Sequence, residues 1–162
     1  MKTIFLAILL IVISPTIGAQ HMEQTNKHFW HTEKTIASAG KIWKIWTDVP
    51  KWKDWDVGLK NASITGNFEL GTKGKIVSLE GRTSKFKVVE FKKGRYYTFK
   101  TNLPFGGLYV KRYLEEKKGS LYFTHEVWFK GLTARAFSKK FGSEFRKMLP
   151  EVMLKIKEIA EQ

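Results

Sequence analysis

Hydrophobic residues in the middle of the chain alternate with polar ones, in short segments separated by glycine. Alternation of this kind places the apolar side chains on one face of a β-strand, and short glycine-containing separators are typical of hairpins. Successive strands are predicted at residues 62–68, 75–79, 83–91, 95–101, 107–115 and 120–130. We expect an antiparallel meander, and an aromatic and β-branched segment at residues 28–36 adds a seventh strand.

Two short helices are predicted between the first strand and the meander. Ser38 can cap a helix that ends near Thr47, because the residue before Pro50 avoids helical angles. A second short helical turn is expected at residues 51–59.

The C-terminal residues follow a different period, with apolar positions every three or four residues. This spacing predicts one long amphipathic helix. Thr133 is its expected cap, and Pro150 predicts a kink, since proline cannot donate to the carbonyl of Arg146. The apolar face consists of Phe137, Phe141, Phe145, Met148, Leu149, Val152, Ile156 and Ile159. The fold class is therefore α+β, with a curved seven-stranded antiparallel sheet wrapped around this helix.

The first residues have the layout of a secretory signal peptide. Lys2 precedes an apolar run at residues 4–13, and the small residue Ala19 ends the segment. We expect a periplasmic or secreted protein. The alternative is an uncleaved membrane anchor, although a bilayer-spanning helix needs roughly 20 apolar residues. No later stretch is apolar enough to span a membrane.

This assignment divides the chain into a signal peptide at residues 1–19, a flexible lead-in at 20–27 and a single domain at 28–162. The chain has no cysteine, so no disulfide supports the fold. Its 29 Lys and Arg residues outnumber 15 Asp and Glu residues, a net charge of +14. Such a surface favours anionic partners, including an anionic membrane, or simply keeps the protein soluble. Export argues against nucleic acid.

The order of elements resembles the helix-grip fold of the SRPBCC superfamily, which includes START lipid-transfer domains, the birch-pollen allergen type and bacterial polyketide cyclase-like proteins. The bacterial polyketide cyclase/dehydrase-like branch is the most similar. The matching pieces are Ile42-Trp43 through Asp48-Val49-Pro50-Lys51-Trp52, then Lys73-Gly74, Gly119-Ser120-Leu121 and the closing helix. The resemblance covers roughly residues 29–160. It implies a cavity between sheet and helix that holds an apolar ligand, but no particular reaction.

Arg112 and His125 are the most specific candidate residues. If Lys118-Gly119 is a two-residue hairpin loop, Arg112 and His125 are cross-strand neighbours on the inward face. A buried guanidinium beside an imidazole needs a carboxylate, a water cluster or an anionic ligand. The alternative is that Arg112 extends out of an open end, or that Glu80 or Glu90 pairs with it.

Aromatic residues are expected around this pair, from the alternating strand faces, the short helices and the first half of the C-terminal helix. Most of these rings would belong to any hydrophobic core, and a minority would line a pocket. The predicted ligand-binding residues are Trp46, Trp55, Phe86, Tyr97, Phe99, Arg112, His125, Phe137, Phe141 and Phe145. His28 and His31 should lie on opposite faces of their strand, so no metal site is expected there, and no cofactor motif occurs.

The favoured function is a monomeric binding or carrier protein for a small hydrophobic or amphipathic molecule, anionic at one end. The alternative is a cyclase- or dehydratase-like enzyme, with His125 as general base and Arg112 stabilising an enolate. Enzyme activity is less favoured, because the sequence indicates no second acid or base beside His125. A third alternative is a peripheral membrane module, in which four tryptophans and the lysines of residues 41–55 contact anionic lipid. The competing interpretation of this segment packs Trp46 and Trp55 under the sheet.

Overall fold

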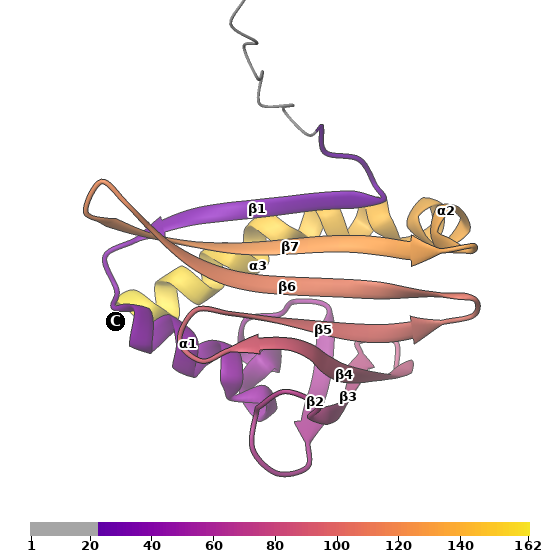
Figure 1. Ribbon diagram of the computed structural model, residues 1–162, viewed down its shortest axis with the longest axis horizontal. Helices are drawn as coiled ribbons and strands as arrows, with labels where there is room; N and C mark the ends of the chain where they lie inside the picture. The colour runs from indigo at the N-terminus through magenta and orange to yellow at the C-terminus, as the bar shows by residue number, and fades with distance from the viewer. Residues whose placement is uncertain (1–22) are drawn as a thin grey trace, which may run out of the picture.

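A curved, seven-stranded antiparallel sheet packs against a long C-terminal helix in the computed structural model, which describes residues 23–162 (Figure 1). The predicted fold class is therefore confirmed, including the two short helices between the first two strands. The predicted signal peptide, residues 1–19, lies outside the described residues. Within residues 23–162, no helix is both long and apolar enough to cross a membrane.

The sheet has the strand order β1-β7-β6-β5-β4-β3-β2, so β2 to β7 form the predicted meander and β1 lies beside β7. The strands are β1 (His28–Thr35), β2 (Leu59–Ile64), β3 (Lys73–Ser78), β4 (Thr83–Lys92), β5 (Tyr96–Leu103), β6 (Gly106–Lys117) and β7 (Ser120–Gly131). The second strand differs most from its prediction at residues 62–68. A turn at Gly66, with φ of 78°, ends it early, and Phe68 instead packs its ring on Tyr97, with 4.6 Å between centroids.

The two short helices cover one end of the inner face. They are α1 (Ala39–Thr47) and the 3₁₀ helix η1 (Val49–Asp54). Ser38 caps α1 as predicted, because its hydroxyl accepts a hydrogen bond from the Lys41 N–H at 3.3 Å. Both helices are amphipathic, and their tryptophans at positions 46 and 52 are fully buried.

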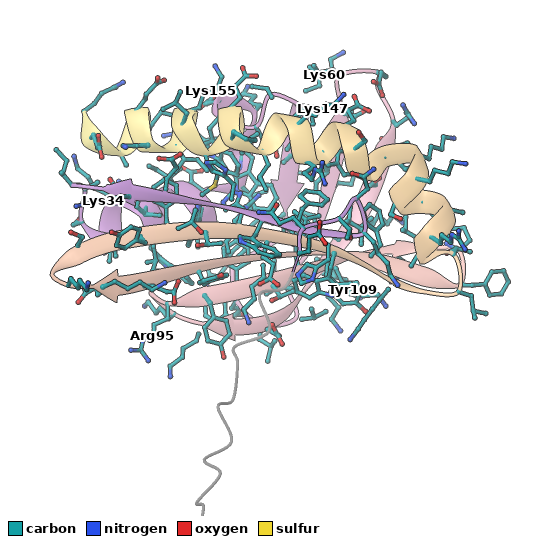
Figure 2. The ribbon with its side chains drawn as sticks, turned by 90° about the horizontal axis from the view of Figure 1, so that it is seen from above. Lys34, Lys60, Arg95, Tyr109, Lys147 and Lys155 are labelled. Atoms are coloured by element: carbon teal, nitrogen blue, oxygen red, sulfur yellow. The ribbon has the colours of Figure 1, made fainter. Side chains whose placement is uncertain are left out.

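The C-terminal helical region consists of α2 (Ala134–Phe137), a π-helical segment η2 (Ser138–Gly142) and α3 (Ser143–Glu161). The α3 helix continues through Pro150, and the departure from α-helical hydrogen bonding lies earlier, in η2. In Figure 2 the ribbon is one continuous helix between the labelled Lys147 and Lys155. Gly142 allows this segment to approach the chain before β1, since a Cβ there would lie 2.0 Å from the Asn26 carbonyl oxygen. Thr133 occupies the cap position, but its hydroxyl donates to the Pro104 carbonyl at 2.5 Å.

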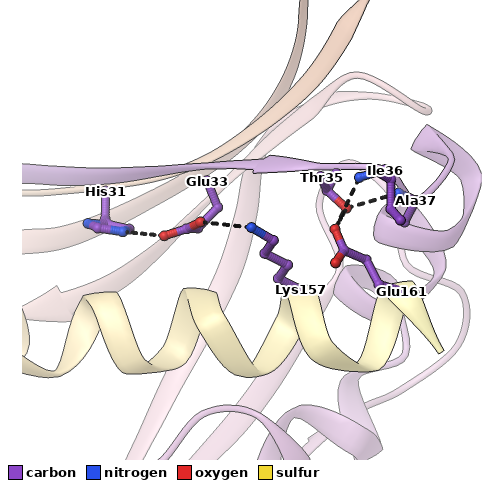
Figure 3. A network of polar contacts seen from close by, with 7 residues as sticks. All are labelled: His31, Glu33, Thr35, Ile36, Ala37, Lys157 and Glu161. Atoms are coloured by element: carbon purple, nitrogen blue, oxygen red, sulfur yellow. Dashed lines mark hydrogen bonds and ion pairs between the residues drawn. The ribbon is translucent and has the colours of Figure 1, made fainter.

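The second half of α3 is fixed to the sheet by apolar and polar contacts. Its inward residues Leu149, Val152, Met153, Ile156 and Ala160 are buried. The Glu161 carboxylate accepts hydrogen bonds from the Thr35 hydroxyl at 2.8 Å and the Ile36 N–H at 3.0 Å, and Lys157 lies 3.6 Å from Glu33 (Figure 3). Both hydrogen bonds lower the pKa of Glu161, and the one from Thr35 has the larger effect. This half of the helix therefore serves as the structural support of the fold.

Candidate functional site

The β6–β7 hairpin brings Arg112 and His125 together. Its turn, Lys118-Gly119, has positive φ at both residues (51° and 73°), as a type I′ hairpin requires. Lys117 therefore pairs with Ser120, and along the same register Arg112 pairs with His125. Both side chains point to the inner face and are buried, with 3% and 2% exposure. The predicted pairing is confirmed.

The Arg112 guanidinium lies among aromatic rings. Its Cζ atom is 4.5 Å from the ring centroid of Trp52 and 4.7 Å from that of Trp55. Phe99 and Tyr97 follow at 5.5 and 5.7 Å. Contacts at these distances are attractive, because the faces of aromatic rings carry negative potential. They partly compensate the positive charge but accept no conventional hydrogen bond.

Among residues 23–162, Arg112 has one hydrogen-bond partner, the neutral hydroxyl of Tyr97. Its Nη1 donates to the Tyr97 hydroxyl at 2.5 Å, and that hydroxyl donates to the Trp46 carbonyl at 3.0 Å. Burial raises the pKa of Tyr97 to about 12, although Arg112 opposes the rise, so the phenol stays neutral. In the part of the chain that the structure describes, no carboxylate lies within 4.0 Å of Arg112. The expected alternative, a salt bridge to Glu80 or Glu90, is not formed: Glu80 pairs with Arg82, and Glu90 lies near Lys111.

Asp56, just after η1, is the carboxyl that the charge of Arg112 influences. Burial raises the pKa of Asp56, while Arg112 and the hydrogen bond from the Gly58 N–H lower it. The Gly58 N–H donates to Oδ1 at 3.1 Å. Asp56 therefore contributes to the electrostatics of the site without a direct ion pair.

His125 is an uncharged neighbour. Its ring lies 5.6 Å from that of Trp46 and 6.0 Å from that of Trp55. Burial, then Arg112, then His31 lower the pKa of His125 well below its ordinary value, so the imidazole is neutral near pH 7. A neutral imidazole can accept a proton as well as donate a hydrogen bond.

Buried nitrogen atoms without a partner gather at this place. Among the described residues, Arg112 Nε, His125 Nε2, Trp46 Nε1 and Trp55 Nε1 are buried and have no hydrogen-bond partner. Buried polar atoms are nearly always paired, and each unpaired one costs about 1–3 kcal/mol. The ring contacts above place all four residues around one point.

A polar row crosses the inner face through this point. In register, His31 lies opposite His125, His125 opposite Arg112, and Arg112 opposite Tyr97. His28 lies opposite Trp128, which confirms that His28 and His31 are on different faces of β1. His31 is half-buried, and its Nε2 lies 2.9 Å from the Glu33 carboxylate, which continues the row toward Lys157 (Figure 3).

The structure brings together seven of the ten predicted ligand-binding residues. Trp46, Trp55, Phe86, Tyr97, Phe99, Arg112 and His125 are all buried between the sheet and the short helices. Phe137, Phe141 and Phe145 are half-buried on the helix, where their rings stack on one another with centroids 6.1 and 6.2 Å apart. Arg82 lies over Phe141 at 5.7 Å, and all three rings pack against the buried core that includes Trp52 and Tyr97.

Sequence reasoning missed Trp52 and Asp56 as site residues. A signal for Trp52 was present, because residues 52 and 55 are three apart and a 3₁₀ helix places such residues on the same face. The burial of Trp46 and Trp55 confirms the interpretation in which they pack under the sheet.

Two surface hollows lie away from this cluster. One, of about 680 Å³, is lined by residues at the Gly94 end of β5, β6 and β7, including Tyr96, Lys111 and Glu126. The other, of about 440 Å³, lies between α1 and β4 and is lined by Trp43, Phe68 and Phe91 among others. Neither is lined by Arg112 or His125, around which the aromatic side chains are packed.

A curved antiparallel sheet that closes around a C-terminal helix is the helix-grip architecture, and comparison with solved structures supports this fold. Hypothetical protein jhp0584 from Helicobacter pylori aligns with a TM-score of 0.67 at 11% identity, over 99% of both chains. Protein MLL2253 from Mesorhizobium loti aligns at 0.66 and 13% identity, over 82% of this chain and 95% of that one. The Aha1 protein from Colwellia psychrerythraea, solved as a dimer, aligns at 0.62 and 18% identity, over 83% and 96%. No protein-family model and no curated protein matches the sequence.

Proposed function

We propose that this protein is an exported binding protein of the SRPBCC type, which holds a small amphipathic molecule between the sheet and the C-terminal helix. The anionic end of this molecule would contact Arg112, and its apolar part would lie among the surrounding rings. The pattern of residues 1–19 supports export. The order of the elements supports the family assignment.

The observation that carries the proposal is a group of four contacting residues, Arg112, His125, Trp46 and Trp55, each with a buried nitrogen that has no hydrogen-bond partner among the described residues. Arg112 Nε and the two indole nitrogens are N–H donors in every protonation state, so the cluster requires an acceptor. A carboxylate, phosphate or sulfonate would satisfy several donors at once and neutralise the guanidinium. A buried charge without an ionic partner costs several kcal/mol, so stability alone does not account for Arg112.

Binding requires side chains to move apart, because the rings around Arg112 are packed. The first half of the C-terminal helix is the most suitable part of the fold for this movement. It contains the π-helical segment η2, and π-bulges are frequent at functional sites. By contrast, the second half is tied to β1 through Glu161 and Lys157 (Figure 3).

A cyclase- or dehydratase-like enzyme is the second candidate function. His125 is neutral and so able to accept a proton, and Arg112 lies beside it to stabilise an oxyanion. The structure also adds Tyr97 and Asp56 to the same interior. The two functions are distinguished by the fate of the ligand, since a carrier releases it chemically unchanged.

The test compares dodecanoate with dodecanol, which share the same alkyl chain and differ in the charge of the head group. Calorimetric titration of the protein should show tighter binding of dodecanoate by about tenfold or more, because a hydrogen bond to a charged group is worth about 1.5–3 kcal/mol. Arg112→Met should abolish the preference while preserving the fold. Arg82→Met is the matched control, since it makes the same change at an exposed hairpin residue.

Equal binding of the two probes by the unmodified protein, or a preference that survives Arg112→Met, would refute the assignment of Arg112. A preference lost equally in Arg82→Met would show that surface charge, and not the interior, selects the anion. Native mass spectrometry of the protein purified from its host identifies any retained molecule. The mass of that molecule is measured again after incubation with the protein. A carrier leaves the mass unchanged, whereas a dehydratase-like enzyme changes it.

A further inference from the structure

The outer face of the sheet carries a cluster of six lysines, here called the lysine field: Lys73, Lys75, Lys85, Lys87, Lys100 and Lys130. Four strands contribute to it. In register, Lys73 lies opposite Lys87, Lys87 opposite Lys100, and Lys75 opposite Lys85. Facing partners in a sheet point to the same side, so these cations are neighbours.

The lysine field has no compensating acid. In residues 23–162, none of its six ammonium groups lies within 4.0 Å of a carboxylate. The outer-face acids Glu90 and Glu126 are engaged elsewhere, with Lys111 and His28 respectively. Like charges directly opposite each other destabilise a sheet, so the fold tolerates an unfavourable arrangement at this end.

Two exposed apolar side chains, here called the apolar tip, lie at the same end of the molecule. Phe105 is 81% exposed in the turn between β5 and β6, and Leu132 is 91% exposed just after β7. The Leu132 N–H donates to the Phe105 carbonyl at 3.0 Å, so the two residues are adjacent. Phe105 has φ of 52°, a left-handed conformation that is rare for a bulky residue. The turn thus holds an aromatic ring in water at a conformational cost.

The lysine field and the apolar tip form one continuous surface. Lys100 pairs with Tyr109 three register positions before the turn, which is about 10 Å along the strands. Lys130 pairs with Gly107, closer still to the turn. An apolar projection next to a row of cations combines the two contributions, buried apolar area and attraction to anionic headgroups, by which a protein binds a charged bilayer surface.

We propose that this end of the protein docks on an anionic phospholipid surface, with Phe105 and Leu132 inserted between headgroups and the lysine field over them. A lipid surface accounts for both features, whereas a soluble polyanion such as DNA would leave the apolar tip in water. The surface is separate from the tryptophan- and lysine-containing segment at residues 41–55, in which Trp46, Trp52 and Trp55 are buried. It shares no residue with the proposed interior site.

The first experiment uses the absence of cysteine from the chain. The Phe105→Cys variant is labelled with the environment-sensitive fluorophore NBD. Its fluorescence emission should shift to shorter wavelength when vesicles of phosphatidylglycerol and phosphatidylcholine are added, and should shift less with vesicles of phosphatidylcholine alone. Ile36→Cys is the matched control. Ile36 is 87% exposed and comes directly after the end of β1 that is farther from Phe105. An equal shift at both positions, or a shift at neither, would overturn the proposal.

The second experiment tests the lysine field by vesicle co-sedimentation. Lys73→Gln combined with Lys87→Gln should lower affinity for anionic vesicles about tenfold or more, since each cation near such a surface contributes about fivefold. Lys147→Gln with Lys155→Gln is the control. Figure 2 shows Lys147 and Lys155 on the helix side of the molecule and Tyr109 on the other side of the sheet.

The quantity compared is the ratio of affinities for anionic and neutral vesicles, because apolar residues 4–13 would affect both alike. An unchanged ratio in the Lys73/Lys87 variant, or an equal loss in the control, contradicts the proposal. Heparin provides the remaining comparison. The lipid assignment is wrong if heparin binds as tightly as the anionic vesicles and if neither Phe105→Leu nor Phe105→Ser weakens binding to heparin or to vesicles. In that case the surface recognises a soluble polyanion.

Discussion

Within the described part of the chain, each face of the sheet carries cations that have no partner carboxylate, but the two faces hold them in opposite environments. On the inner face one cation, Arg112, is buried among aromatic rings. On the outer face six lysines are in contact with water. An unpaired charge inside a protein costs several kcal/mol, whereas exposed like charges cost tenths, because water and salt screen them. The inner face is thus suited to one anionic group in a fixed geometry, and the outer face to many charges with no fixed geometry.

Aromatic residues also differ in burial between the two faces of the sheet. Trp52 on the inner side is fully buried, stacks on Phe86 at 5.5 Å and donates its indole N–H to the Trp46 carbonyl at 3.0 Å. Trp128 on the outer face is half-buried and stacks on Tyr109 at 5.3 Å. The inner ring contributes to the fold and the enclosure of Arg112, and the outer one covers the sheet surface.

The largest predicted effect is on stability when the inner ring is removed. Trp52→Ala should lower the free energy of unfolding by about 3–5 kcal/mol, because it leaves a cavity and removes the cation–π contact with the Arg112 guanidinium. Trp128→Ala should cost about 1 kcal/mol or less, since it removes a surface pair. Urea denaturation followed by circular dichroism measures both. Comparable losses in the two variants would mean that the two faces are not energetically distinct.

The sequence predicted the Arg112–His125 pairing because one local feature determines it. Lys118-Gly119 can form a two-residue turn, and such a turn fixes the register of the whole hairpin. The position of Trp52 over Arg112 was not predictable in this way. It depends on how η1 folds back over a sheet whose strands lie far along the chain.

Other features depend on details that alternation alone does not show. The alignment of the lysines across β3, β4 and β5 depends on an irregularity between Val88 and Glu90, which changes which β4 residues face outward. The dense packing around Arg112 depends on the volumes of rings from four separate elements. A hydrophobic pattern identifies the inner residues, but it does not determine whether they leave a space.

A pH-dependent effect of intermediate size should come from the inner face. The pKa of His125 is well below its ordinary value in the folded protein, because of burial, Arg112 and His31. Below about pH 6.5 the unfolded chain therefore binds a proton that the folded protein does not. The contribution of neutral His125 to the free energy of unfolding should be fully present above pH 7. It should fall as the pH decreases from about 6.5, by up to about 1.4 kcal/mol per pH unit.

Urea unfolding of the unmodified protein and of His125→Gln between pH 5 and pH 7.5 tests this effect. The variant should lose most of the slope. Asp56→Asn is a useful control, because burial raises the pKa of Asp56 and its titration acts in the opposite sense. That variant should keep the His125 slope. A slope that persists in His125→Gln would assign the acid sensitivity to other groups.

The smallest predicted effect lies on the outer face, where charge reversal should stabilise the protein. Lys87 lies between Lys73 and Lys100, so Lys87→Glu replaces two repulsive cross-strand pairs with attractive ones and should raise the free energy of unfolding by about 0.5–1 kcal/mol. Lys111→Glu is the control with the opposite expected sign. The Lys111 Nζ atom lies 3.9 Å from the Glu90 carboxylate, so reversing this charge should lower the free energy of unfolding. Both changes should shrink in 0.5 M salt, because the charges are exposed. If Lys87→Glu instead destabilises at low salt, the lysines do not repel one another measurably, and the lysine field carries no electrostatic strain that an anionic surface could relieve.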